Sequence, residues 1–209
     1  ANLLTPEEKA WLKSHQVIQL LGDTGWPPIG FTDPSGRYQG VAADYINLIG
    51  RRLGIRFEVI SDHSRNQIPE LIKSGKANGV SCMVKEEEPA QWLSFSAPYF
   101  VSPDVIVTKK KTPAIFGIEN LAGKTLAVEE GVFLESKLKK QYAKIILKPV
   151  KNTVAALESV AGGEAYAYVG NLMVIKYLLN AKGIDTLKIA APAPWPESRL
   201  RIGIRKDWP

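Results

Sequence analysis

The chain is poor in the residues that metal sites and covalent catalysis use. It has 209 residues, with one cysteine, Cys82, and two histidines, His15 and His63. One cysteine excludes an internal disulfide, and the sequence contains no GxSxG motif, no HExxH motif and no Cys/His spacing typical of a metal site. We therefore expect a protein that is not an enzyme, with no catalytic residue, no metal and no other cofactor.

Long hydrophobic runs are also absent. No apolar stretch approaches the ~20 residues of a membrane-spanning helix. The chain begins at Ala1 without the charged and apolar regions of a signal peptide, so we expect any leader to be absent or already removed. Hydrophobic residues make up 45% and charged residues 23%, as in globular proteins, and the length suits one large domain or two small ones.

The one clear excess is positive charge, a formal net charge of +6. Lysine and arginine are spread along the chain, and the single tight run is Lys109–Lys111. Nucleic-acid binding favours basic residues gathered on one face, so we expect no nucleic-acid partner. The overall charge favours anionic ligands or surfaces.

Hydrophobic periodicity predicts two βαβαβ units. In the first, strands are expected at 17–21, 55–60 and 79–84, with helices at 41–53 and around 68–72. In the second, strands are expected at 124–128, 145–150, 165–169 and 187–191, with helices at 132–142, 153–162 and 171–181. A capping box at Thr5–Glu8 predicts one further helix at the start of the chain.

Two proline-containing segments connect these units. The first, 95–108, ends in a strand at 105–107, and the second surrounds Trp195. The alternating segment 199–205 comes after the second unit is complete, so we expect it to return to the first. These patterns predict lobe 1 as residues 1–108 plus 196–209 and lobe 2 as 109–195. Two lobes with two crossings form a hinged clamshell, in which ligand binding couples to closure.

The stretch 20–31, LLGDTGWPPIGF, places an acid and an indole after a buried strand. Pro27 and Pro28 prevent the strand from continuing. In open α/β sheets ligands bind beyond the carboxyl ends of the strands, so Asp23 and Trp26 are candidate ligand contacts. The alternative is a core tryptophan beside a loop aspartate.

The order of several short motifs resembles the bacterial extracellular solute-binding proteins of family 3. Its closer likeness is to the periplasmic Venus-flytrap sensor domains of membrane histidine kinases. The segments that carry it are, in order, LTPEEKAWLKSH, GDTGWPPIGF, YQGVAADYINLIGRRLG, LIKSGKAN, FSAPY, ENLAGKTLAVEEG, AYAYVGNLMVIKYLL and GIRKDW. The resemblance implies an α/β fold of the periplasmic-binding type II class: a two-lobed clamshell of mixed sheets flanked by helices, with a ligand in its cleft.

The same resemblance gives an incomplete ligand grip. Asp23 matches the acid that faces the ligand's amine, and Trp26 the aromatic that stacks on the ligand. Val84 and Pro89 stand where amino-acid binders have a threonine and the arginine that holds the α-carboxylate. Asn171 stands at the acid that neutralises the α-ammonium, and an amide does not neutralise a cation. We therefore do not expect a plain α-amino acid as ligand.

Further candidate contacts surround these positions. Arg65 falls near a second stacking aromatic of the family, and the loose alignment makes His63 a neighbouring candidate. The helix start after Glu129 could accept an anionic group, although Glu129 and Glu130 would oppose it. For Arg65 and Lys85 the alternative is a solvated surface charge. The complete set of expected contacts is Asp23, Trp26, His63, Arg65, Ser81, Cys82, Lys85, Glu129, Gly131, Val132 and Asn171.

The expected function is a periplasmic sensor domain that closes around an amino-acid-like compound, an organic acid or an amine. As in the sensors it resembles, a transmembrane segment and a cytoplasmic output domain, in a histidine kinase, would be its partners, with a homodimer as one option. One alternative is the soluble binding protein of an ABC importer. Others are a dehydratase-like enzyme, with Asp23 and Glu129 as acid and base, and a ligand-free lobe pair that signals through a partner protein.

Overall fold

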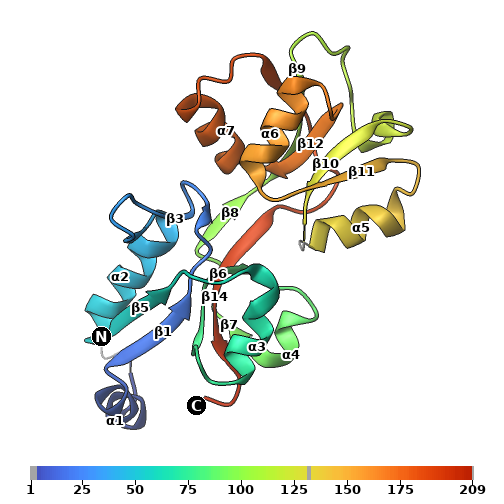
Figure 1. Ribbon diagram of the computed structural model, residues 1–209. Coiled ribbons are helices and arrows are strands. Elements are labelled where there is room, and N and C mark those ends of the chain that lie inside the picture. Colours follow the sequence, from blue (N-terminus) through green and yellow to red (C-terminus); the bar gives the residue numbers. More distant parts are fainter. Residues whose placement is uncertain (1–3, 131–132, 209) are drawn as a thin grey trace. The chain divides into compact units, whose positions relative to one another are not determined.

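The computed structural model describes residues 4–130 and 133–208, which divide into two compact units (Figure 1). The first unit comprises Ala1–Thr24, Ile29–Phe100 and Arg199–Pro209, and the second comprises Gly25–Pro28 and Val101–Ser198. This division places the boundaries at 100 and 198, whereas the sequence predicts them at 108 and 195. The earlier boundary moves because the strand predicted at 105–107 pairs within the second unit's sheet.

The first unit is built on a mixed sheet with the strand order β5-β1-β6-β14-β7, and β8 also pairs with β14. Strand β1 is parallel to β5 and β6, whereas β14 is antiparallel to β6 and β7. The bounds are β1 Val17–Leu21, β5 Arg56–Ile60, β6 Gly79–Val84, β7 Leu93–Phe95, β8 Phe100–Ser102 and β14 Ser198–Arg205. A separate small three-stranded sheet has the order β2-β3-β4, with β2 Gly25–Trp26, β3 Gly30–Thr32 and β4 Tyr38–Gln39.

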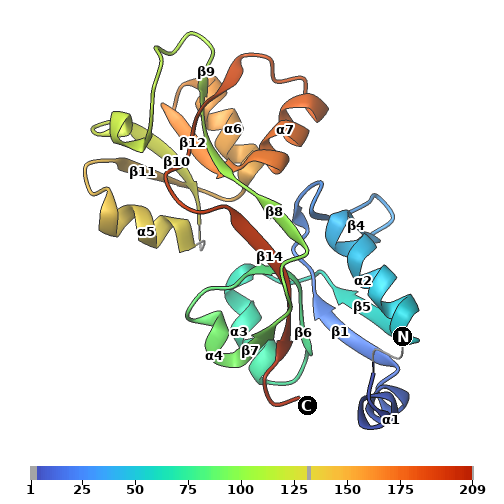
Figure 2. The same ribbon diagram turned by 180° about the vertical axis from the view of Figure 1, so that it is seen from behind.

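Helices cover both faces of the first unit's main sheet (Figures 1 and 2). One apolar cluster joins Ile18 and Leu20 of β1 to Ile46 of α2, and another joins Leu21 to Ile68 and Ile72 of α3. Alternate residues of β1 thus enter opposite cores, which explains its nearly continuous apolar sequence. The helices are α1 Pro6–Ser14, α2 Val41–Leu53, η1 Arg65–Gln67, α3 Ile68–Lys73 and α4 Pro89–Trp92.

Helix α1 begins where the capping box predicts and packs against the end of the chain. The Thr5 backbone N–H donates to Glu8, and the Glu8 N–H donates to the Thr5 hydroxyl. The Trp11 and His15 rings stack with centroids 3.9 Å apart, and the Trp208 ring meets Trp11 edge-on at 5.0 Å. Segments from the two ends of the sequence therefore meet in the first unit.

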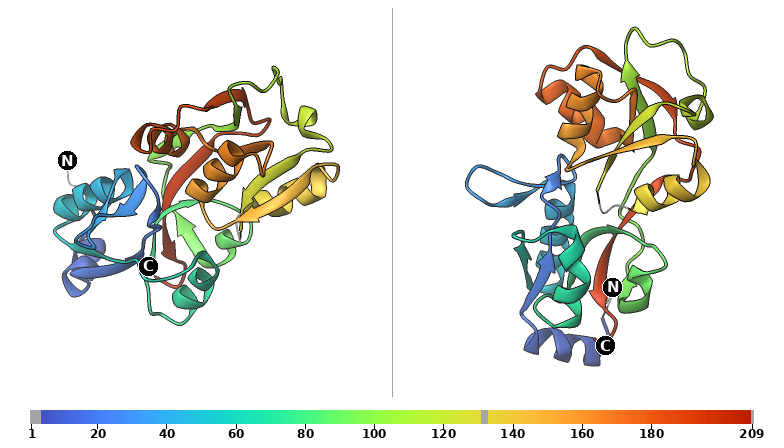
Figure 3. Two further views of the ribbon diagram at one scale, coloured as in Figure 1. Left: turned by 45° about the horizontal axis from the view of Figure 1, so that its top comes forward. Right: turned by 45° about the vertical axis from the view of Figure 1, so that its right-hand side comes forward.

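The second unit repeats the sheet order of the first, as β11-β10-β12-β9-β13. Strand β10 is parallel to β11 and β12, and β9 is antiparallel to β12 and β13. Helices α6 and α7 lie side by side (Figure 3). The bounds are β9 Asp104–Lys109, η2 Ile118–Leu121, β10 Thr125–Glu129, α5 Phe133–Gln141, β11 Ile146–Val150, α6 Thr153–Gly162, β12 Ala167–Asn171, α7 Leu172–Ala181 and β13 Leu187–Pro192.

Most predicted elements are confirmed within two residues, and the final strand joins the first unit's sheet as expected. The prediction of a strand at 165–169 was two residues early, since β12 runs over Ala167–Asn171. The pattern missed the three strands of the small sheet, α4, β7 and β8, and each of these elements has four residues or fewer. Within the described residues, no helix has both the length and the apolar character to cross a membrane.

Candidate functional site

The carboxyl end of β1 in the first unit leads into a tightly packed loop that carries Asp23. A Cβ atom on Gly22 would lie 2.4 Å from a methyl carbon of Val59, and one on Gly30 would lie 2.6 Å from the Asp23 carbonyl oxygen. Glycine is therefore required at both positions, because backbone and side chains fill the space that a Cβ would need. This packing fixes Asp23 at the edge of the sheet.

Two tyrosine hydroxyls meet the middle of β6 at Ser81 and Cys82. The Tyr38 hydroxyl lies 3.1 Å from the hydroxyl of Ser81, which donates to the Leu21 carbonyl at 3.2 Å. The Tyr99 hydroxyl donates to the Ser81 carbonyl at 2.9 Å and hydrogen-bonds the Cys82 thiol. Burial is the main cause that raises the pKa of both tyrosines. Both hydroxyls therefore stay protonated and can act as donors.

His63 lies close enough to Asp23 to feel its charge. Burial lowers the pKa of His63, and the negative charges of Asp23 and Asp62 oppose that shift. The His63 Nδ1 atom is buried and has no hydrogen-bond partner among the described residues. A neutral imidazole with an unused nitrogen can accept or donate one hydrogen bond to a bound molecule.

The second unit presents a different arrangement at the corresponding edge. Glu129, the last residue of β10, accepts hydrogen bonds from the hydroxyls of Thr153 and Tyr168, each at 2.7 Å. Tyr168 is buried, and its pKa is raised first by burial and then by the charge of Glu129. The hydroxyls orient the carboxylate and partly satisfy it, as is required when a charged group is withdrawn from water.

Asp104 brings a second carboxylate to this edge. It begins β9 and is the register partner of Asn171, the last residue of β12. The Trp195 indole N–H donates to Asp104 at 2.8 Å, and the Lys137 ammonium lies over the Trp195 ring at 4.7 Å. Burial raises the pKa of Asp104, while the Trp195 hydrogen bond and the charge of Lys137 oppose that rise.

The side-chain amide of Asn171 has a structural role as the N-cap of α7. Its side-chain oxygen accepts from the Ser102 hydroxyl and from the Met173 N–H, each at 3.0 Å, and so caps α7. Its Nδ2 atom is buried without a hydrogen-bond partner among the described residues. Asp104 lies directly across the strand pair from Asn171 and brings a carboxylate one strand away.

The structure places the other predicted contacts as follows. Trp26 lies in β2, is half-buried, and groups with the second unit. Ser81 is fully buried, and its hydroxyl supports Tyr38, whereas Lys85 is exposed just after β6. Gly131, Val132 and the side chain of Arg65 lie outside the described residues. No group of three or more His, Cys, Asp or Glu side chains in the described residues is arranged to hold a metal ion.

Sequence reasoning missed several polar residues at the two edges, namely Tyr38, Tyr99, Asp104, Thr153, Tyr168 and Trp195. None follows the end of a predicted parallel strand, which was the signal used. Asp104 had a usable signal, because it directly precedes the strand predicted at 105–107. Its position beside Asn171 depends on antiparallel pairing between strands far apart in the sequence.

Comparisons with known proteins agree with this fold. The family model described as bacterial extracellular solute-binding proteins, family 3, matches residues 18–209. The virulence sensor protein BvgS of Bordetella pertussis is 27% identical over 98% of this chain, and the sensor protein EvgS of Escherichia coli is 25% identical over 85%. The chain spans only 16% and 15% of the length of these two relatives.

Two solved structures illustrate the same fold. The periplasmic VFT2 domain of B. pertussis BvgS superposes with a TM-score of 0.86 at 23% identity, covering 97% of this chain and 86% of that one. An ancestral arginine-binding protein bound to arginine gives a TM-score of 0.82 at 26% identity, covering 93% and 86%. The two-lobed α/β fold class expected from the sequence is confirmed.

Proposed function

Because the chain belongs to the bacterial extracellular solute-binding proteins of family 3, we propose that it is a ligand-binding sensor domain of a membrane signalling receptor. The observation that carries this proposal is the similarity to BvgS over 98% of the chain. The same similarity leads us to propose that the receptor also has a transmembrane segment and a cytoplasmic kinase, and that this domain lies in the periplasm. A ligand that prefers one arrangement of the units would shift their equilibrium by its differential affinity.

The polar edges support a small molecule that carries an amine. Asp104 and Glu129 are held at the edge of the second unit, and Asp23 lies at the edge of the first. The resemblance to the family predicts that Pro89 stands where amino-acid binders carry the arginine that grips the α-carboxylate. We therefore propose an amine or an amine-bearing polar compound as the ligand class, without the bidentate carboxylate grip of an amino-acid carrier.

Native mass spectrometry of the gently purified chain, compared with its denatured mass, is the first test. A retained small molecule would give the ligand's mass directly. A thermal-shift screen of amines, amino acids and organic acids would follow, since a ligand that binds the folded state raises the Tm in proportion to the logarithm of its concentration.

Three single variants then separate the ligand site from general charge effects. Asp23→Asn and Asp104→Asn should each weaken binding of the screened amine by about tenfold or more, because each removes a charge-assisted contact. Asp44→Asn is the matched control, since Asp44 is exposed on α2 and loses the same charge. Equal weakening by all three variants would count against a site at these edges.

A soluble carrier for an ABC importer is the second candidate, because a putative amino-acid ABC transporter-binding protein of Vibrio harveyi, PatH, is 28% identical over 71% of this chain. The enzyme alternative predicts slow turnover of a dehydratable substrate, which product analysis would detect. A partner-driven domain predicts that Asp23→Ala with Trp26→Ala leaves receptor signalling unchanged, whereas a ligand sensor should lose or lock its response.

A further inference from the structure

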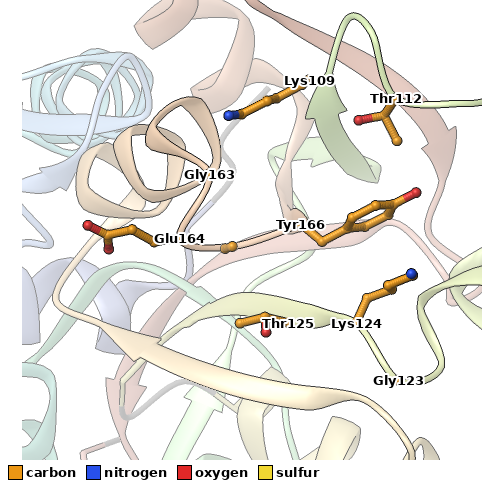
Figure 4. A pocket seen from close by; sticks show the side chains of 9 residues that line it. Lys109, Thr112, Gly123, Lys124, Thr125, Gly163, Glu164 and Tyr166 are labelled. Carbon is orange, nitrogen blue, oxygen red and sulfur yellow. The ribbon is translucent and has the colours of Figure 1, made fainter.

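A second polar pocket lies at the opposite end of the second unit's sheet (Figure 4). Thr125 begins β10, whereas Glu129 ends the same strand. Four residues of extended strand separate these ends by about 13 Å. The pocket has a volume of about 380 Å³ and is lined by Lys109, Thr112, Gly123, Lys124, Thr125, Gly163, Glu164, Ala165 and Tyr166. It is therefore distinct from the carboxylate edge described above.

The charges around this pocket are unbalanced in favour of cations. Among the described residues, neither Lys109 nor Lys124 forms an ion pair with a carboxylate. The one acid in the lining, Glu164, pairs with Lys148, which is outside the lining. A further cation, the Lys188 ammonium, donates to the Thr112 carbonyl at 2.7 Å. The pocket thus keeps a positive charge that its own carboxylate does not cancel.

The lining also offers hydroxyl donors. Figure 4 shows Lys109 and Thr112 on one side of Tyr166 and Lys124 on the other. The Lys124 ammonium lies 5.3 Å from the centre of the Tyr166 ring, which holds the long side chain against the wall. Hydroxyls of Thr112, Thr125 and Tyr166 add neutral donors.

Glycine leaves room for the second ammonium. Gly163 ends α6 with φ +89°, a conformation that side chains rarely adopt, and a Cβ there would lie 2.8 Å from the Lys109 nitrogen. Lys109 therefore rests against bare backbone at the carboxyl end of α6. It adds positive charge beside helix carbonyls that would otherwise repel an anion.

We propose that this pocket binds a phosphate group, either free or carried on a small organic compound. Lysine ammoniums bind phosphate as point charges, and hydroxyl donors complete the oxygen contacts. The volume exceeds that of inorganic phosphate and leaves space for an organic part. The site gives the domain a second input, independent of the ligand at the carboxylate edges.

The test is a titration of the intact chain with inorganic phosphate. The changes in the amide NMR chemical shifts of Gly123 and Gly163 report the binding. Sodium chloride at equal ionic strength is the reference titration. The double variant Lys109→Gln/Lys124→Gln should weaken phosphate binding by at least about tenfold, because each lysine supplies a charge-assisted contact. Asp104→Asn, at the other end of the sheet, should leave the phosphate titration unchanged.

The matched control is Lys110→Gln/Lys111→Gln, which removes the same charge from adjacent exposed lysines outside the pocket. Binding within about twofold of the parent chain is expected for this control, since exposed surface charges contribute little. The proposal is overturned if phosphate changes these amide chemical shifts no more than chloride does. It is also overturned if both double variants weaken phosphate binding equally. It is also overturned if Lys109→Gln/Lys124→Gln lowers only the Tm and leaves binding intact, because the lysines then serve the helix end alone.

Discussion

In both units a central strand, β1 or β10, runs parallel to two neighbours and ends at the edge that carries polar side chains, yet the two edges differ in chemistry. The first unit offers tyrosine and serine hydroxyls, an imidazole and one loop carboxylate. The second offers two carboxylates held by hydroxyl and indole donors. One sheet order thus supports two sets of functional groups, because edge residues are free to vary while strand interiors must fill the core.

The basic residues are divided just as sharply. All eight arginines lie outside residues 101–198, and that segment has thirteen lysines and no arginine. Arginine binds carboxylates and phosphates bidentately, whereas lysine is a flexible point charge. A bidentate arginine contact with an anion is therefore available only from the first unit, and the cationic side chains of residues 101–198 are all lysines.

The largest expected effects come from equivalent leucines in the two central strands. Leu20 pairs with the first residue of β6 and Leu126 with the first residue of β12, and both are fully buried. Leu20→Ala and Leu126→Ala should each lower the free energy of unfolding by about 2–5 kcal/mol in a urea titration. Leu48→Ala, at a partly exposed position, should cost less than about 1 kcal/mol. If Leu126→Ala lowers the free energy of unfolding by less than about 1 kcal/mol, the residues around Leu126 can fill the cavity that the substitution leaves.

The strand partners of Leu20 and Leu126 are Gly79 and Ala167, and substitutions at these two positions should differ in cost. A Cβ on Gly79 would lie 2.1 Å from the Gly203 carbonyl oxygen, whereas the equivalent residue in the second unit, Ala167, already carries one. Gly79→Ala should destabilise the chain by about 1–3 kcal/mol or more, through crowding. Ala167→Gly should cost only about 0.5–1 kcal/mol, through backbone entropy. Chemical denaturation of both variants measures the difference, and equal costs would contradict the crowding at Gly79.

Two tyrosines allow a hydrogen bond to a charged acceptor to be compared with a hydrogen bond to a neutral group. Tyr168 donates to Glu129, whereas Tyr38 lies beside the Ser81 hydroxyl. Tyr168→Phe should cost about 1.5–3 kcal/mol and Tyr38→Phe about 0.5–1.5 kcal/mol, because hydrogen bonds to charged groups are stronger. Denaturant titrations at neutral pH provide the comparison. The reverse order would indicate that Glu129 does not depend on the Tyr168 hydroxyl.

The smallest expected effects are on the pH dependence of the free energy of unfolding, to which Asp33 and Asp104 contribute with opposite signs. Hydrogen bonds from Ser35 and Arg37 lower the pKa of Asp33 below 3.8, so its stabilising contribution is present above that pH and lost as the pH falls. Burial raises the pKa of Asp104, so stability declines as the pH rises from 3.8 through the shifted value. Asp33→Asn should flatten the acid side of the stability curve, and Asp104→Asn the decline with rising pH. Unfolding titrations between about pH 2 and pH 7 test both slopes.

Local signals carried most of the fold. The capping box fixed the start of α1, and helical spacing closed by Gly54, with φ +71°, fixed α2. The same signals placed Asp23 and Glu129 at strand ends. They could not place Asp104 beside Asn171 or Tyr168 beside Glu129, because those contacts depend on the register of distant strands. Asn171 was readable as a departure from the family, but its role as the cap of α7 required the structure.

The contact of Trp11 with Trp208 also decides how the chain would carry tension. A pull applied to the two ends would first separate these rings and peel α1 and β14 away from the first unit. Along the sequence, all strands of the second unit's sheet lie between residues 104 and 192, inside the segment that β14 follows, so they would bear no load until then. Force spectroscopy should therefore record rupture of the first unit before the second.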